Sequence, residues 1–503
     1  MTDYKHGAYG ALGDTVARAS AAAETVPVHF GTAPVNLIRG WKTAQVVNRP
    51  LKIASKADGR EKLGESSDWE SYTLCESLAA HYDTSMEGIG PVYVVNVLDP
   101  DKHRSKESST AVLSFAAGTA YIESDTIILD SLSLSAGGGE GAQQTALSEG
   151  TDYSVSYDFA SGRAILTSLD KEHPIDGEVC ATFETVDPSK VTAQDVIGSA
   201  TESAPAGIGA IGLVYQEHFA VPNLLAAPGW SDNPDVYRAL VAAATKINGH
   251  WDAFVMADLP LSLSKSRNVD TIQAAIEWKS DSGYSSERSA VFWPQAVDSR
   301  GRAWHLSSLA TAEAMRVDAD NDGVPFAGWS NRTVPVVRQR FAEGSASVGF
   351  DQRAANQLNA HGITTAVGWA GEWVLWGPHT AAFCDGASYD QRAAFATGIR
   401  MLLYLTNAFQ ARWAPYIDGP MTRQLQDRIL NSEQERLDAL VAQGALVGSP
   451  QILFESSGNP DSALLSGDFL WEVAVTPVLP LKSATVRVSY TDEGLSSYLE
   501  GDE

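Results

Sequence analysis

The sequence predicts an α/β (α+β) multidomain protein: a core built on a mixed sheet, an inserted all-β domain, and extended arms at both ends. Strand and helix patterns alternate over residues 27–98 and resume after residue 196, which is typical of an α/β core. Residues 99–195 contain only short β-like runs separated by Gly, Ser and Asp clusters. The first 26 residues lack a sustained apolar period, which predicts an arm that partners must order.

The first part of the core has three recognisable patterns. VPVHFGTAPV, from Val26, predicts a strand and a turn. WESYTLCESLAAHY (69–82) predicts an amphipathic helix, because its apolar residues recur at three- and four-residue spacing. PVYVVNVL (91–98) is a continuous apolar run, as found in strands covered on both faces.

The insert at 99–195 is distinguished by its charge. It has 17 acidic and six basic residues, a net charge of −11 in under a fifth of the chain. Such a density of like charge favours a strongly solvated position, so we expect an outer domain.

The core continues over 196–387, with helices expected at 235–247 and 269–278 and strands at WDAFVMADL and SAVFWPQAV. Residues 388–483 predict a C-terminal domain with two long helices broken near Pro415 and Gly419, followed by strand-like runs. The second helix has an apolar stripe of Leu425, Ile429, Leu430, Leu437, Leu440 and Val441. Residues 484–491 alternate like a strand, with Val486, Val488 and Tyr490 on one side, so 484–503 is predicted to be a second arm.

Composition excludes several classes of protein. With 503 residues, 44% of them hydrophobic, the chain can bury large cores and is not disordered throughout. A net charge of −26 disfavours nucleic acid and anionic lipid as partners. No run approaches 18 apolar residues, so we expect no membrane insertion, and the first residues do not resemble an export signal. Three widely spaced cysteines favour a reducing, cytoplasm-like compartment.

One segment resembles a metal site. Asp318, Asp320, Asp322 and Gly323 match the first half of an EF-hand loop, but the twelfth position, which needs a bidentate acid, is Trp329. We therefore reject the metal site and predict a structural Asp/Asn/Gly turn.

Other motifs point away from catalysis. Gly207-Ile-Gly209-Ala-Ile-Gly212 fits GxGxxG but follows SATESAPA instead of a strand, so it predicts a glycine-rich surface turn. The tryptophans at 369, 373 and 376 could line a sugar site, although core strands joined by a hairpin turn explain them better. No HExxH, GxSxG or Walker A pattern occurs, and we expect no enzyme activity and no cofactor.

A series of phrases, in order, resembles the tail sheath protein family of contractile phage tails and tailocins. They are GTAPV, GPVYVVNVLDP, VPNLLAAPGW, VFWPQAV, GWSNRTV, NQLNAHGITTAVGWAGEWVLWGPHT and RLDALVAQGALVGSPQILFE followed by SGDFLWEVAVTPVLP. They cover about residues 26–98 and 200–490. Trp329 departs from the family, which usually has Pro before the Ser-Asn pair, and the resemblance does not extend to the 99–195 insert, as expected of a module that varies between sheaths.

The resemblance implies a structural subunit of a virion, assembled in the bacterial host cytoplasm. Sheath subunits stack as hexameric rings around a tail tube, exchange terminal arms with their neighbours, and contract to drive the tube through the target envelope. Implied partners are further copies of the chain, the tail tube protein, and baseplate and tail terminator proteins. Residues 27–98 and 196–387 would form the core sheath domain and 388–483 the C-terminal sheath domain.

Two groups of site residues are expected from this resemblance. Candidates for strand exchange are Tyr4, His6 and Tyr9 in the first arm and Val486, Val488 and Tyr490 in the second. Candidates for facing the tube are Arg412, Arg423, Asp427 and Arg428.

Two alternatives stay open at this point. The sheath could belong to a tailocin or another contractile injection particle. A rival from a different class is a secreted, calcium-dependent carbohydrate-binding protein or hydrolase, which would use the tryptophan cluster and Asp318, Asp320 and Asp322.

Overall fold

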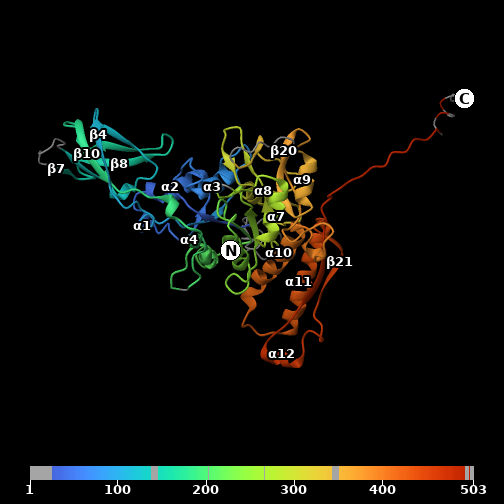
Figure 1. Ribbon diagram of the computed structural model, residues 1–503. Helices are drawn as coiled ribbons and strands as arrows, with labels where there is room; N and C mark the ends of the chain where they lie inside the picture. Colours follow the sequence, from blue (N-terminus) through green and yellow to red (C-terminus); the bar gives the residue numbers. More distant parts are fainter. Residues whose placement is uncertain are drawn as a thin grey trace, which may run out of the picture.

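A buried, largely parallel sheet organises the core of the computed structural model, which describes residues 25–136, 145–201, 203–264, 267–342, 350–492, 495 and 498 (Figure 1). The strand order is β2-β3-β1-β11-β12-β15-β19-β20. The strands are β1 (Pro27–Gly31), β2 (Pro50–Ile53), β3 (Val92–Asn96), β11 (Leu224–Ala226), β12 (Phe254–Asp258), β15 (Ser289–Phe292), β19 (Ile363–Trp369) and β20 (Glu372–Trp376). Strands β3 to β19 run parallel, and β2 and β20 are antiparallel at the two edges. The predicted mixed α/β core is confirmed.

Helices cover both faces of this sheet, so every position of its inner strands β1, β3, β11, β12 and β15 is buried. Leu224, Ala226 and Phe254 face the cluster that contains α3 (Thr73–Tyr82) and α8 (Leu306–Asp320). The alternate residues of β11 and β12 face the other cluster, to which α6 and α7 contribute. The other helices of the core are α1 (Trp41–Ala44), α2 (Lys56–Leu63), α4 (Ala193–Ile197), α5 (Gly212–His218), α6 (Pro234–Ala243), α7 (Ile272–Asp281) and α9 (Gln352–Asn359). Because successive side chains of a strand point to opposite faces, each strand contributes side chains to both layers of helices.

Between β3 and α4 the described chain contains strands and short 3₁₀ turns but no α-helix. The strands are β4 (Ser109–Phe115), β5 (Thr119–Glu123), β6 (Ser133–Ala136), β7 (Thr145–Leu147), β8 (Tyr153–Asp158), β9 (Arg163–Ser168) and β10 (Gly177–Phe183). They form two antiparallel sheets, β4-β10-β6-β7 and β5-β9-β8, which enclose an apolar cluster of their own. In Figure 1 this β-rich region projects from the side of the core.

The C-terminal part consists of two long helices and a strand pair. Its elements are α10 (Ala396–Trp413), α11 (Arg423–Ala442), β21 (Leu446–Leu453), α12 (Asp461–Ser466) and β22 (Glu472–Pro477). The predicted break between the helices lies at 414–422, and Ile429, Leu437 and Leu440 of the predicted stripe are buried. The short helix α12 between the strands was not predicted.

Two sequence predictions about single elements were wrong in detail. SAVFWPQAV is two strands in different sheets, β15 and β16 (Gln295–Val297), because Pro294 has no N–H to continue the ladder. Strand β16 pairs instead with β17 (Ala303–Trp304) and β18 (Arg338–Arg340). The predicted helix at 69–82 begins only at Thr73.

The glycine motif at 207–212 is also not a surface turn. It forms a buried 3₁₀ helix (Gly207–Ile211) that continues into α5. Gly207 has a φ of 54°, and a Cβ there would lie 2.3 Å from the carbonyl oxygen of Val196. A Cβ at Gly209 would lie 2.2 Å from the backbone of Ser199. The glycines are therefore needed for close backbone packing.

Two short strands, β13 (Ser262–Ser264) and β14 (Arg267–Asn268), complete the described elements as an antiparallel pair. None of the helices in the described ranges combines the length and the apolarity that crossing a membrane requires.

Candidate functional site

The last segment of the described chain is extended and has no partner strand. Beyond Pro477 no strand is formed in the described residues, and in Figure 1 the chain runs away from the body of the molecule. Val486, Val488 and Tyr490 are 83–86% exposed. An alternating sequence with an uncovered apolar side is what a strand offers before it joins a sheet.

A short sheet lies directly before this segment. Strands β21 and β22 pair antiparallel, from Leu446 opposite Pro477 to Leu453 opposite Glu472. Leu446 and Ile452 are buried in the cluster beneath β21, to which α11 contributes. This is a two-stranded sheet in the described structure, so each strand has an outer edge that can accept another strand.

A small groove runs beside β22. Its volume is about 250 Å³, and Phe395 and Leu402 of the α10 region line it opposite Val475 and Pro477. The groove is mostly apolar, and Leu479, which also lines it, is 71% exposed. Apolar side chains of an added strand would find cover here.

At the opposite end of the chain, the first described residues are hydrogen-bonded to the core. The hydroxyl of Thr25 donates to the carboxylate of Asp318 at 2.5 Å, and the amide of Val26 donates to the side-chain oxygen of Asn223 at 2.8 Å. Both residues are buried. The predicted exchange residues Tyr4, His6 and Tyr9 lie outside the described residues.

The predicted tube-facing residues differ in exposure. Arg423, Asp427 and Arg428 lie exposed on the first turns of α11. Arg412 is partly buried and pairs with Glu433, which also accepts from the indole N–H of Trp413 at 2.6 Å. Arg412 therefore joins α10 to α11, whereas a role of the other three residues at the tube stays a prediction.

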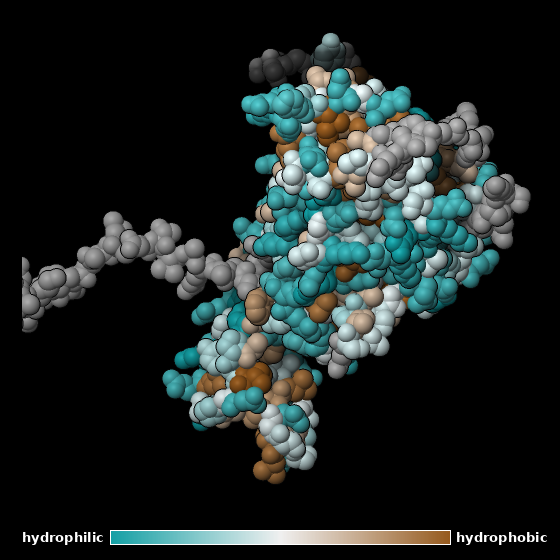
Figure 2. Space-filling model, turned by 90° about the vertical axis from the view of Figure 1, so that its left-hand side faces the viewer, coloured by the Kyte–Doolittle hydropathy of each residue, from teal (hydrophilic) through white to brown (hydrophobic). Residues whose placement is uncertain are grey.

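The lower end of the C-terminal part is apolar at its surface. Figure 2 shows hydrophobic side chains gathered at this end of the molecule, where Figure 1 places α12. Leu465 on α12 is 88% exposed and Leu470, which follows α12, is 47% exposed.

The rejected metal motif has a structural role that differs from the predicted turn. Asp318 and Asp320 belong to the last turn of α8, and only Asp322 and Gly323 lie beyond the helix. Asp318 is buried and pairs with Arg400 of α10, and its burial raises the pKa of the carboxyl above its ordinary value, partly offset by that arginine. Among the described residues no group of three His, Cys, Asp or Glu side chains is placed to hold a metal ion.

The tryptophans at 369, 373 and 376 lie on β19 and β20, as expected for strands joined by a hairpin turn.

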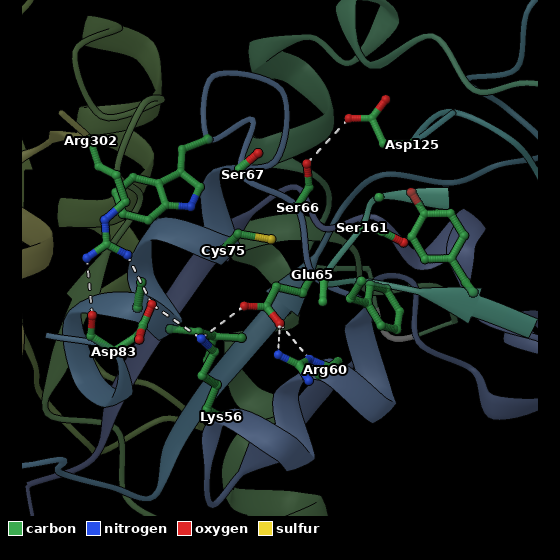
Figure 3. Close-up of a pocket in the computed structure, with 18 of the residues that line it drawn as sticks. Lys56, Arg60, Glu65, Ser66, Ser67, Cys75, Asp83, Asp125, Ser161 and Arg302 are labelled. Atoms are coloured by element: carbon green, nitrogen blue, oxygen red, sulfur yellow. Dashed lines mark hydrogen bonds and ion pairs between the residues drawn. The ribbon is translucent and has the colours of Figure 1, made fainter. Parts of the chain in front are cut away.

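A cleft of about 590 Å³ separates the core from the β-rich region (Figure 3). On the core wall an ion-pair chain runs from Arg302 through Asp83 and Lys56 to Glu65, which also binds Arg60. The opposite wall includes Asp125 and Ser161 from the β-rich region. The paired charges tie the ends of α2 and α3 to the turn before β17, and across the cleft the hydroxyl of Ser66 donates to the carboxylate of Asp125 at 3.4 Å.

Sequence reasoning missed a pair of a buried acid and a partly buried histidine above the carboxyl ends of the sheet. Glu76 on α3 accepts from Nδ1 of His305 at 2.7 Å, from the His305 amide at 2.6 Å and from the hydroxyl of Ser308 at 2.9 Å. Burial alone would lower the pKa of His305, but the charge of Glu76 outweighs it and raises the pKa to about 9. The partners are more than 220 residues apart, so no local motif reveals them.

Comparison with known proteins supports the resemblance seen in the sequence. No family model matches the chain. The tail sheath protein of Burkholderia phage BcepMu is 26% identical over 497 residues, covering 95% of this chain and 98% of the relative. A sheath complex of an extracellular contractile injection system, in its contracted state, aligns over 98% of this chain and 99% of the other with a TM-score of 0.54 at 13% identity. The sheath tail protein of Desulfitobacterium hafniense aligns over 94% of this chain and 100% of the other with a TM-score of 0.51 at 10% identity. Sequence and fold together confirm that this chain resembles the tail sheath proteins of contractile phages and injection systems.

Proposed function

We propose that the chain is a structural, non-enzymatic subunit of a contractile tail sheath. Copies of it assemble as stacked hexameric rings around a tail tube, and contraction of the sheath drives the tube through the target envelope. The observation that carries this proposal is the extended, alternating segment 484–490, whose apolar residues Val486, Val488 and Tyr490 are exposed, beside a two-stranded sheet with open edges. The likeness to sheath proteins over nearly the whole chain supports it.

The arm and the sheet are complementary in chemistry. An added strand gains main-chain hydrogen bonds from the free edge of β21 or β22, and these bonds need little sequence information. Burial of Val486, Val488 and Tyr490, now exposed, would add roughly 1.5–3 kcal/mol for each side chain. A chain that folded this segment onto its own hairpin would have no free strand to donate. The arm of one subunit therefore completes the sheet of its neighbour, and links of this kind hold rings together while they slide and rotate.

Each remaining part of the chain has a role in the proposed sheath. Residues 27–98 and 196–387 form the core sheath domain and 388–483 the C-terminal sheath domain, with the 99–195 insert on the outside. The exposed α11 residues Arg423, Asp427 and Arg428 face the tail tube. Baseplate and tail terminator proteins bind the two ends of the assembly, and the protein is a virion component assembled in the host cytoplasm. The particle is a phage tail or a tailocin-like injection particle built on the same plan.

The test is polymerisation of the purified protein, observed by negative-stain electron microscopy and sedimentation. Wild-type protein should form long, striated, hollow cylinders. The triple variant Val486→Ser, Val488→Ser and Tyr490→Ser should remain a folded monomer, because it loses the apolar side of the arm. The matched control Thr485→Ala, Arg487→Ala and Ser489→Ala changes the other side of the same segment and should still polymerise. Equal polymerisation of both triple variants would rule out the arm as a strand donor, and a wild type that never polymerises would contradict the sheath function.

A further inference from the structure

A second cleft, of about 740 Å³, lies at the carboxyl ends of the parallel strands. Its floor includes Thr73 at the start of α3, Gly229 after β11, and His305. The order of the strands reverses at β1 and β11: the chain proceeds from β1 to β3 on one side, and from β11 to β12, β15 and β19 on the other. This is the place at which open α/β sheets bind their ligands.

The walls of this cleft carry an unusual share of the positive charge of an acidic protein. Arg338 and Arg340 stand two residues apart on β18, so they point to the same side, while Gln339 between them is buried. Arg300 and Arg302 come from the turn between β16 and β17 and complete a set of four guanidinium groups in the lining. The acids in the lining are Asp68, Glu70 and Glu76, and Glu76 is paired with His305.

The four arginines are not equally engaged. Arg302 is fixed, since it binds Asp83 and Asp298 and lies 5.0 and 5.1 Å from the rings of Trp69 and Trp304.

The other three guanidinium groups are more available. Arg340 donates to the side-chain oxygen of Gln295 at 3.0 Å and pairs with Glu70 at 3.2 Å, but Glu70 is 83% exposed and can be displaced. Arg300 is 62% exposed and approaches Asp83 only at 3.6 Å. Arg338 is exposed and has no ion-pair or hydrogen-bond partner among the described residues. A carboxylate entering the cleft can displace Glu70 and bind Arg338 and Arg340 together.

We propose that this arginine cleft, lined by Arg300, Arg302, Arg338 and Arg340, receives an acidic segment of a second copy of the chain. The inference rests on the proposed function, because it requires self-assembly. With 62 acidic and 36 basic residues, copies of this chain repel one another at long range unless bases are placed where the copies meet. A cluster of four arginines, in which Arg338 has no side-chain partner among the described residues and Arg340 pairs with an exposed acid, is such a place.

The shape of the cleft favours a peptide over a small anion. Ser67, Trp69 and Arg302 line both this cleft and the one between the core and the β-rich region, so the two clefts adjoin. A cleft of this size suits a peptide segment with several carboxylates, whereas a phosphate-sized ion would occupy only a fraction of 740 Å³.

The first test is a charge reversal in the polymerisation assay. The variant Arg338→Glu and Arg340→Glu should raise the protein concentration needed for polymer about tenfold or more. The control Arg332→Glu and Arg353→Glu makes the same charge change at exposed positions outside the cleft and should polymerise like wild type. Circular dichroism and thermal unfolding establish that both variants are folded. If wild type polymerises and the cleft variant does so equally well, the inference is wrong although the sheath function stands.

The second test identifies the occupant. The variant Arg338→Lys and Arg340→Lys keeps the charge and supplies amines for a carbodiimide cross-linker. Polymers are assembled from a mixture of ¹⁴N- and ¹⁵N-labelled protein and analysed by mass spectrometry. Mixed-isotope cross-links from positions 338 and 340 to Asp or Glu are the expected result. Cross-links confined to one isotope, such as those to Glu70 of the same copy, would overturn the inference, as would saturable binding of inorganic phosphate in the cleft together with unchanged polymerisation of the Glu variant.

Discussion

Asp318 on α8 and Arg400 on α10 form an ion pair in the interior of the protein, where their side chains are 1% and 5% exposed. The same carboxylate accepts a hydrogen bond from Thr25, the first described residue, which lies at the end of the predicted N-terminal arm. One buried acid therefore joins the core, the first helix of the C-terminal part and the base of the arm. In the proposed sheath, a pull on the arm would reach both other parts through this group.

Loss of this carboxylate should destabilise the monomer. We expect Asp318→Asn to lower the free energy of unfolding by about 3–5 kcal/mol, because Arg400 would remain buried without its counter-charge. Denaturant unfolding followed by tryptophan fluorescence measures this. Asp320→Asn is the control, since Asp320 lies two residues away on the same helix and is exposed. Equal effects of the two variants would contradict a special role of the buried pair.

The pair of Glu76 and His305 predicts a pH dependence of stability. The pKa of His305 is about 9 in the folded state against an ordinary value of 6.5, so its charge stabilises the fold fully below pH 6.5. This contribution is lost as the pH rises from 6.5 through 9, and it amounts to about 3 kcal/mol at about 1.4 kcal/mol per pKa unit. The difference in unfolding free energy between wild type and His305→Gln should therefore shrink across this range. The variant His173→Gln, at an exposed histidine, should show no such trend.

The sequence predicted those features that depend on neighbouring residues and missed those that depend on residues far apart in the chain. The strand at 92–96 and the helix at 423–442 were expected because periodicity and a central apolar run are properties of neighbouring residues. The exposed alternation at 486–490 was likewise visible in the sequence. The sequence predicted a turn at Asp318 and did not reveal that this residue is a buried partner of Arg400, because the two residues are 82 positions apart. The arginine cleft was missed for the same reason: its bases come from the turn before β17 and from β18, which only the pairing of β16, β17 and β18 brings together.

Substitution of Gly207 tests whether the glycine motif at 207–212 is required for close packing and not for nucleotide binding. Gly207→Ala should destabilise the monomer by about 2–4 kcal/mol, because it adds a clash with the carbonyl of Val196 to the cost of a left-handed conformation. Gly283→Ala is the control: Gly283 also has a positive φ, of 77°, but a Cβ there meets nothing within 4 Å. Gly283→Ala should lower the free energy of unfolding by only about 1–2 kcal/mol. Thermal unfolding of the two variants side by side measures the difference, and equal losses would show that the close approach is unimportant.

The N-terminal arm can be separated from the fold by two truncations. Removal of residues 1–20 keeps Thr25 and Val26, whose hydrogen bonds to Asp318 and Asn223 anchor the start of the core. This protein should unfold like wild type but form no sheath-like tubes by electron microscopy, because it has lost the arm it would donate. Removal of residues 1–26 should in addition destabilise the monomer, since Asp318 and Asn223 lose buried partners at a cost of about 1–3 kcal/mol for each group. Normal tubes from the shorter truncation would refute the exchange role of this arm, whereas equal monomer stability of the two truncations would refute the anchoring role of Thr25 and Val26.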